Sequence, residues 1–467
     1  MFQFGQIARK LGDWILPAYL GVGLLIGGAS REGILASGVL QAVGACILIW
    51  CALDTRLPGP DKRARWFVWS VALFIVCLLL QLVPLPPEIW TTLPGRDFVV
   101  EGFGLLARDE LPWMPLSLAP QETAEGLLRF IPPIAVFVLT YKTASRREEN
   151  RVLFVLISVA VLSAVLGMIQ IFDGKDSAFY FWEITNRGHA VGLMANANHQ
   201  AIFLVSVLPF CTVYLSRLKI HAEMGDVDAG QFLFVILAML LLVIGIIIAG
   251  SLAGYILLGP VAAMSFLLYR GRKVGALDVL GGLVGAAAVA GLGWWLSFSP
   301  VLPALGVTNL ADTELGRLNS WRLTIAAASD FYPFGSGLGS FEKLIPFYED
   351  QAAITGKFLN HTHNDYLEVW LELGVVGIVL MIVVLAAFLR LSFAAWMSDG
   401  SERLRMKKAS SIAVCAVCLH SIVDYPLRTE TIAILTALAL GQLATDALKR
   451  QRRANERDAV SPAHIII

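Results

Sequence analysis

Charged residues are scarce in this sequence: they make up 15% of its 467 residues, whereas 57% are hydrophobic. Soluble globular proteins carry about 25% charged residues. The shortfall, together with many apolar runs near the length of a membrane span, excludes a soluble or disordered protein and indicates a polytopic helical membrane protein. Basic and acidic residues number 36 each, so net charge gives no sign of nucleic-acid binding, and none is expected.

Cysteine is also scarce, and all six cysteines lie in or beside apolar runs. None lies in a stretch expected outside the cytoplasm, so we predict no structural disulfide. Cys415 and Cys418 form a Cys-x-x-Cys pair inside a run of alanine, valine and leucine. This setting favours two small buried hydrophobic side chains over a redox or metal pair.

The apolar runs predict an all-α membrane protein with about twelve transmembrane helices, because a backbone in hydrocarbon must bond to itself. The first run is expected to be a retained helix, since no small-x-small cleavage site precedes the next run. The approximate spans are 12–29, 34–52, 66–84, 127–141, 152–172, 201–216, 232–249, 251–269, 275–297, 373–390, 410–424 and 430–447.

The distribution of lysine and arginine predicts that both termini are cytoplasmic. With the N-terminus inside and strict alternation, 25 of the 36 basic residues fall on the cytoplasmic side. The expected organisation is one transmembrane domain, 1–447, and a basic cytoplasmic tail, 448–467, predicted to be disordered. The longest extracytoplasmic loop, 298–372, lies between helices 9 and 10.

Ionisable residues are nearly absent from the centres of the predicted spans. Ion-coupled carriers place such residues at mid-membrane, so their absence argues against a coupled transporter. The polar residues are gathered instead in four segments on the outer face.

The first segment surrounds His363 and Asn364, which are followed after nine residues by Gly374 and then by Gly377. A helix over 363–377 would place His363 on one face and the carboxylates of the segment on another. A histidine at a water–membrane boundary near carboxylates suits a general base, although an interfacial anchor for a helix end is an open alternative. The His-x-His spacing lacks further ligands at a recognisable offset, so no metal site is expected.

The second segment contains Arg317 and Arg322, followed by Gly335, Gly337 and Gly339 at alternate positions. Arginine suits bidentate capture of phosphate oxygens. The glycine run is not a phosphate-binding P-loop, because no Lys-Ser/Thr follows it, and a flexible turn is favoured. The SWRLTIAAASDFY stretch permits a short amphipathic helix on the membrane surface, acting as a lid.

The third segment, 185–200, contains Arg187, Asn198 and His199 just before the sixth span. These residues could cap the helix or bind sugar hydroxyls and a diphosphate, and both interpretations stay open. In the fourth segment, 420–430, His420 and Asp424 lie one helical turn apart and can pair with each other. A role in lining a site is equally open.

In combination, these motifs resemble the O-antigen ligase and polymerase superfamily of bacterial envelope enzymes. The ligase histidine motif is His, then Asn, Ser or Gln, nine residues, Gly, two residues, and Gly, Thr or Tyr. The segment from His363 to Gly377 fits it in full. The similarity extends to Gly316-Arg317 with Trp321, to the Pro333–Phe341 glycine run, to ANANH before a span, and to HSIVDYPLR.

The resemblance implies transfer of a glycan from a polyprenyl diphosphate at the periplasmic face of the bacterial inner membrane, without a metal or other cofactor. His363 would be the general base, and Arg317 and Arg187 would stabilise the leaving diphosphate. In-line attack would invert the anomeric centre. The expected substrate-binding residues are Arg322, His361, Asn364, Glu368, His199, Asn198, Asp424 and Arg428.

The acceptor is not decided by the shared motifs. Polymerisation of exopolysaccharide or O-antigen repeats is favoured, and ligation to lipid A–core is the alternative. A protein O-oligosaccharyltransferase is less favoured, because no separate soluble domain follows the last span. A flippase for lipid-linked glycans would need a charged central cavity, which the sequence lacks. A structural scaffold would leave the outer-face arginines and histidines unexplained.

Overall fold

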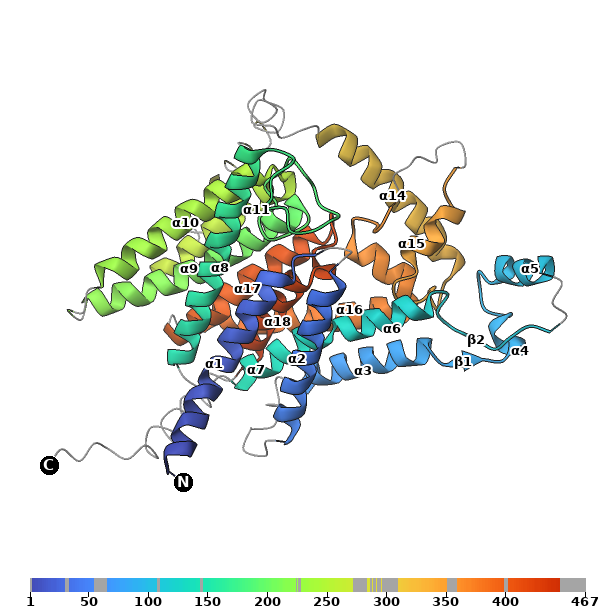
Figure 1. Cartoon of the computed structure of the whole chain (residues 1–467), viewed down its shortest axis with the longest axis horizontal. Helices are drawn as coiled ribbons and strands as arrows, with labels where there is room; N and C mark the ends of the chain where they lie inside the picture. The colour runs from blue at the N-terminus through green and yellow to red at the C-terminus, as the bar shows by residue number, and fades with distance from the viewer. Residues whose placement is uncertain are drawn as a thin grey trace.

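The computed structural model describes residues 2–29, 33–53, 65–106, 110–142, 146–223, 225, 228–271, 310–350, 359–398 and 402–445, with isolated residues between 284 and 295. The predicted ninth span, 275–297, and the predicted tail, 448–467, therefore lie outside the described residues, apart from those isolated positions. The described part is helical, with one short pair of strands (Figure 1).

The helices of the N-terminal half are α1 (Phe2–Ile26), α2 (Ile34–Leu53), α3 (Arg65–Gln81), α4 (Pro87–Trp90), α5 (Asp97–Leu105), α6 (Pro120–Arg129), α7 (Ile131–Lys142), α8 (Arg146–Asp173) and α9 (Ala197–Glu223). Strands β1 (Pro84–Leu85) and β2 (Met114–Pro115) pair in antiparallel fashion. In Figure 1 the segment from β1 to β2, with α4 and α5, projects beyond the ends of α3 and α6.

The C-terminal half contains α10 (Ala229–Ala249), α11 (Leu252–Arg270), α14 (Leu310–Asp330), α15 (Phe341–Leu344), the 3-10 turn η1 (Ile345–Phe347), α16 (Asp365–Met397), α17 (Glu402–His420), the 3-10 turn η3 (Pro426–Arg428) and α18 (Glu430–Ala444). The predicted break between the seventh and eighth spans is confirmed. Gly250 ends α10 in the left-handed conformation, and Ser251 caps α11 by accepting the Gly254 N–H at 3.2 Å.

Seven helices of the described residues are long and apolar enough to cross a membrane, and three shorter apolar helices accompany them. The prediction of an all-α membrane protein is therefore confirmed, whereas the count of twelve spans and the cytoplasmic termini remain predictions. The fourth predicted span corresponds to α7, which joins α6 at Phe130. The break lies just before Pro132 and Pro133, which have no amide hydrogen to donate within a helix and so occupy the first turn of α7.

Helix α9 is the centre of the bundle, with its side chains buried almost continuously from Ala197 to Arg217. It packs against α8, α10, α11 and α17, and α18 packs against α7, α17 and α1 (Figure 1). Because α9 begins at the third polar segment and α17 ends at the fourth, this packing brings those two segments to the same end of the bundle.

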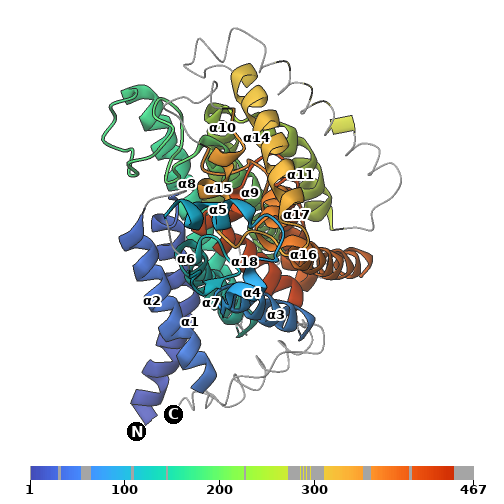
Figure 2. The same ribbon diagram turned by 90° about the vertical axis from the view of Figure 1, so that its right-hand side faces the viewer.

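Helix α14 occupies the predicted 298–372 loop and lies against the start of α16 (Figure 2). Its Ala327 and Ala328, with Phe331 just after the helix, form a small core with Phe341 of α15 and Leu371 of α16. A helix is therefore present where the SWRLTIAAASDFY pattern permitted one. The packing places the second polar segment beside the first.

Candidate functional site

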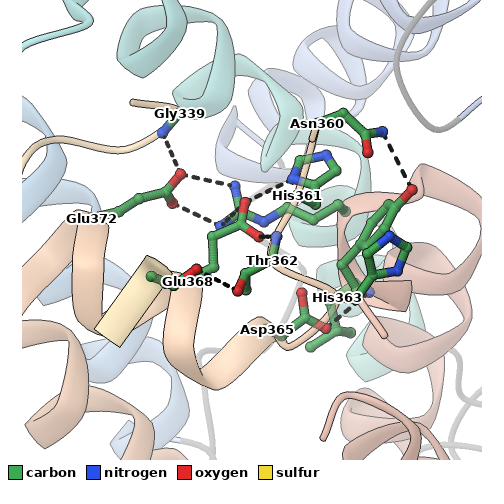
Figure 3. Close-up of polar contacts among 12 residues, drawn as sticks. Gly339, Asn360, His361, Thr362, His363, Asp365, Glu368 and Glu372 are labelled. Carbon is green, nitrogen blue, oxygen red and sulfur yellow. Dashed lines mark hydrogen bonds and ion pairs between the residues drawn. The ribbon is translucent and has the colours of Figure 1, made fainter. Parts of the chain in front are cut away.

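The four polar segments meet around the loop that precedes α16, whose own polar contacts are drawn in Figure 3. The Asp365 N–H donates to the Ser421 carbonyl at 3.0 Å. Trp321 of α14 donates its indole N–H to the His363 carbonyl at 3.3 Å. At the start of α9, His199 Nδ1 lies 2.7 Å from the Thr429 hydroxyl. Segments separated by more than 200 residues in the sequence therefore form one site.

His363 is not helical, whereas a helix over 363–377 would have begun at this residue. Its φ is +55°, and the side chain of Asn364 caps α16 by accepting the Tyr366 and Leu367 N–H groups at 3.0 Å. The helix begins at Asp365 because Asn364 satisfies its first free amides. A left-handed φ costs a non-glycine residue about 1–3 kcal/mol, so the surrounding contacts hold His363 in place.

The hydrogen-bonding partner of His363 is Asp424. His363 Nδ1 lies 3.1 Å from Asp424 Oδ1, and the side chain of His363 is 24% exposed whereas that of Asp424 is 1% exposed. The same oxygen accepts the Tyr425 N–H at 3.0 Å, and His199 Nε2 lies 3.9 Å away. An ionised carboxylate can only accept a hydrogen bond, so His363 donates its Nδ1–H to Asp424 and the ring nitrogen left for other chemistry is Nε2.

Of the two interpretations left open for His420 and Asp424, side-chain pairing between them is not observed. His420 is buried at the end of α17, and neither ring nitrogen has a hydrogen-bond partner among the described residues. Asp424 acts on His420 electrostatically, while its hydrogen bond goes to His363. The turn after α17 thus directs Asp424 toward the histidine loop.

Tyr425 is the residue that the sequence interpretation missed. Its ring centroid lies 5.0 Å from that of His199, 4.3 Å from that of His361 and 5.0 Å from that of His363. Burial, with the negative charge of Asp424, raises the pKa of the Tyr425 phenol above its ordinary value. Its place between Asp424 and Pro426 in the fourth motif was the available signal.

A second group of contacts surrounds Arg428. Its Nη2 lies 2.7 Å from Glu372 Oε2 and 3.3 Å from Glu368 Oε1, and both carboxyl groups are fully buried. Glu368 Oε1 also lies 2.7 Å from His361 Nδ1 (Figure 3). Burial alone would lower the pKa of Arg428, but the two carboxylates raise it above its ordinary value.

The glycine run forms a specific turn on α16. Gly335, Gly337 and Gly339 all have positive φ, and the Gly337 and Gly339 amides donate to Glu372 at 3.0 and 2.8 Å. Gly374 of the histidine motif is a kink with φ +57°, where a Cβ would lie 2.1 Å from the Pro333 carbonyl oxygen. The glycines therefore permit close backbone contact, and the amides of Gly337 and Gly339 are already used within the protein.

The three arginines expected to meet the donor have different surroundings in the structure. Arg317 is partly buried on α14; its charge acts on His420, and its Nε has no hydrogen-bond partner within the described part of the chain. Arg322 is exposed on the same helix. Arg187 is exposed in the loop before α9, where its guanidinium lies 5.5 Å from the Tyr180 ring centroid.

In the loop before α9 the structure shows a helix cap, whereas binding of sugar hydroxyls or a diphosphate stays a prediction. Asn196 caps the helix, since its side-chain oxygen accepts the Asn198 N–H at 2.8 Å. His199 instead faces Asp424 and Thr429. The segment therefore contributes one helix cap and one site histidine.

Residues 237–382 match the family model described as O-antigen ligase. The match covers about a third of the chain and confirms the resemblance indicated by the motifs. No curated protein matches the chain.

The O-antigen ligase match contains the glycine run, Arg317 and the histidine loop with Glu368 and Glu372. The groups that complete the site, including His199, Asp424 and Arg428, lie outside it in the sequence and reach it through the fold. The site is thus built from the segment that matches the family model, the start of α9 and the turn between α17 and α18.

Proposed function

We propose that this protein transfers a glycan from a polyprenyl-diphosphate donor to an acceptor hydroxyl at the periplasmic face of the bacterial inner membrane. The observation that carries the proposal is the His363–Asp424 pair, placed where all four motifs meet. His363 Nε2 takes the acceptor proton, and Asp424 fixes the Nδ1–H tautomer and stabilises the imidazolium that forms. The match to O-antigen ligases supports glycosyl transfer of this general type.

The leaving diphosphate carries the charge that the site must stabilise. Arg317 suits this task best, because its partly buried guanidinium lies near His420 with a free Nε. Arg187 and Arg322 are exposed and would meet the donor from the loop before α9 and from α14. The sugar–phosphate bond is already activated, so the reaction balances without a metal: the acceptor oxygen displaces the diphosphate with inversion.

We favour another lipid-linked repeat as the acceptor of the chain, so that the product is a polymer of exopolysaccharide or O-antigen repeats. Lipid A–core is the second candidate acceptor, because the matched family model is described by ligase activity. Both reactions use the same donor chemistry and the same His363 base. The two acceptors therefore have to be distinguished by analysing the glycan products.

The test is mass spectrometry of polyprenyl-linked glycans, with a gel of surface polysaccharide, in a strain that lacks the protein. A polymerase predicts single repeats on the lipid and no long chains, whereas a ligase predicts long chains held on the lipid. Complementation with wild type should restore the normal pools, and His363→Ala at equal membrane abundance should not. Unchanged pools in the deletion strain would contradict glycosyl transfer by this protein.

A further inference from the structure

Arg428 differs from Arg317 in that its charge is already matched inside the protein. Its Nη2 contacts both Glu372 and Glu368, and its Nη1 lies 3.5 Å from Glu372 Oε1. Two buried carboxyl groups thus surround one guanidinium, whose hydrogen-bonding capacity is directed toward the protein. A guanidinium already engaged by two carboxyl groups would have to give up these contacts to bind a diphosphate, so Arg428 is poorly suited to the expected donor-binding role.

The other bonds of these carboxylates hold the rest of the site. Glu372 Oε1 accepts the Gly339 N–H at 2.8 Å, which fastens the glycine turn to α16. Glu368 Oε2 accepts the Thr362 N–H at 3.1 Å, and its Oε1 lies 2.7 Å from His361 Nδ1. Arg428, on the turn that also carries Asp424, is the shared partner of both carboxylates. One guanidinium therefore joins the glycine turn, the histidine loop and the Asp424 turn (Figure 3).

We propose that Arg428, Glu368 and Glu372 form a positioning clamp that sets the histidine loop against the Asp424 turn, and that Arg428 does not bind the donor diphosphate. The clamp acts through His363. It holds the loop just before His363, so that His363 keeps its strained conformation and reaches Asp424. The reaction that it serves is the one proposed above. The clamp itself is defined by contacts that do not depend on the donor.

The test compares Arg428→Met, which loses the charge, with Arg428→Lys, which keeps the charge but loses the two-pronged contact. The first readout is the rate at which diethyl pyrocarbonate acylates His361, measured by mass spectrometry relative to His221, which is exposed at the far end of α9. The second readout is kcat for transfer from lipid-linked glycan. The third is inhibition of that transfer by farnesyl diphosphate, which tests binding of the donor diphosphate. Lys343→Met is the matched control, because Lys343 forms an ion pair with Glu122 on an exposed outer surface.

A clamp predicts faster acylation of His361 in Arg428→Met, a kcat lower by about 100-fold because the base is misplaced, and unchanged inhibition by farnesyl diphosphate. Arg428→Lys should give an acylation rate of His361 and a kcat between those of Arg428→Met and wild type. Lys343→Met should match wild type in both. Weaker inhibition by farnesyl diphosphate, with normal acylation of His361, would overturn the clamp and make Arg428 a donor ligand.

A second variant and the behaviour of wild type distinguish failure of the clamp from failure of the proposed function. If Arg428→Met does not fold, Glu372→Gln removes one clamp charge while keeping an acceptor for the Gly339 N–H, and the same acylation readout applies. If wild type does not transfer glycan, the proposed function fails. The acylation of His361 still decides whether the clamp exists.

Discussion

In the proposed reaction the base is His363, which the fold holds in a conformation that costs energy. Its φ of +55° is stabilised by the bond to Asp424, by the Trp321 indole on its carbonyl and by the Asn364 cap that follows it. A residue held this way has little freedom to reorient when an acceptor binds. Such preorganisation favours proton transfer, because the base is already aligned before the reaction begins.

Asp424→Asn tests whether the charge of Asp424 matters to the base. The amide oxygen can still accept from His363 Nδ1 and from the Tyr425 N–H, but it cannot stabilise an imidazolium. We expect kcat to fall by about 100-fold, within the range typical of acid–base catalysis, with KM for the donor little changed. Asp330→Asn, which changes an exposed carboxylate bonded to Tyr348 at 2.9 Å, is the matched control. Equal loss in both variants would contradict a specific role for Asp424.

At the scale of residues, the sequence predicted which side chains belong to the cluster better than it predicted which of them bond to each other. His361, His363, Glu368 and Asp424 do lie in one cluster, and Glu368 and Glu372 do reach a common partner. The sequence could not show that Asp424 bonds His363 and not its helical neighbour His420, because the choice depends on the turn after α17. For the same reason Tyr425, which has no chemistry of its own in the proposed reaction, was overlooked.

At the scale of elements, the kink of α16 and the glycine turn form one unit. The Val375 N–H donates to the Pro333 carbonyl at 2.9 Å, and the Ser336 N–H donates to the Leu371 carbonyl at 2.9 Å. The amide and carbonyl groups of α16 that lose their helical partners at the kink therefore form hydrogen bonds with the glycine turn. The spacing of Gly374 within the histidine motif was visible in the sequence, but its partner is a loop 40 residues away, which only the fold reveals.

Gly374→Ala should therefore destabilise the protein. The added Cβ would lie 2.1 Å from the Pro333 carbonyl oxygen, and alanine disfavours the φ of +57°. Together these effects should cost about 2–4 kcal/mol of unfolding free energy, measured as a lower thermal midpoint in detergent. Gly102→Ala is the control, since a Cβ there meets nothing within 4 Å, and its midpoint should stay the same or rise. A normal midpoint for Gly374→Ala would show that the kink is not required.

At the scale of the whole molecule, the predicted orientation places the site outside the cytoplasm. The apolar runs predicted most of the helices correctly because membrane spans have a strong composition signal. Segments such as α14 and the β1–β2 pair were less predictable, since outer-face elements fold by contact with the bundle and not by their own hydropathy.

Cysteine labelling in intact cells tests this orientation. In a cysteine-free background, Ser329→Cys on the exposed face of α14 should react with a membrane-impermeant maleimide that has reached the periplasm. Glu223→Cys, at the exposed end of α9, should react only after the cells are broken, because the basic residues there predict a cytoplasmic position. The reverse pattern would place the site on the cytoplasmic side and exclude a periplasmic reaction.

The most direct test of the central claim is glycan transfer by the purified protein in lipid nanodiscs. The donor would be the lipid-linked glycan that accumulates in the deletion strain, and products would be followed by mass spectrometry. We predict that wild type converts this donor to longer or acceptor-linked glycans without added nucleotide, and that His363→Ala, folded and equally abundant, forms none. Transfer by His363→Ala at the wild-type rate would contradict the account.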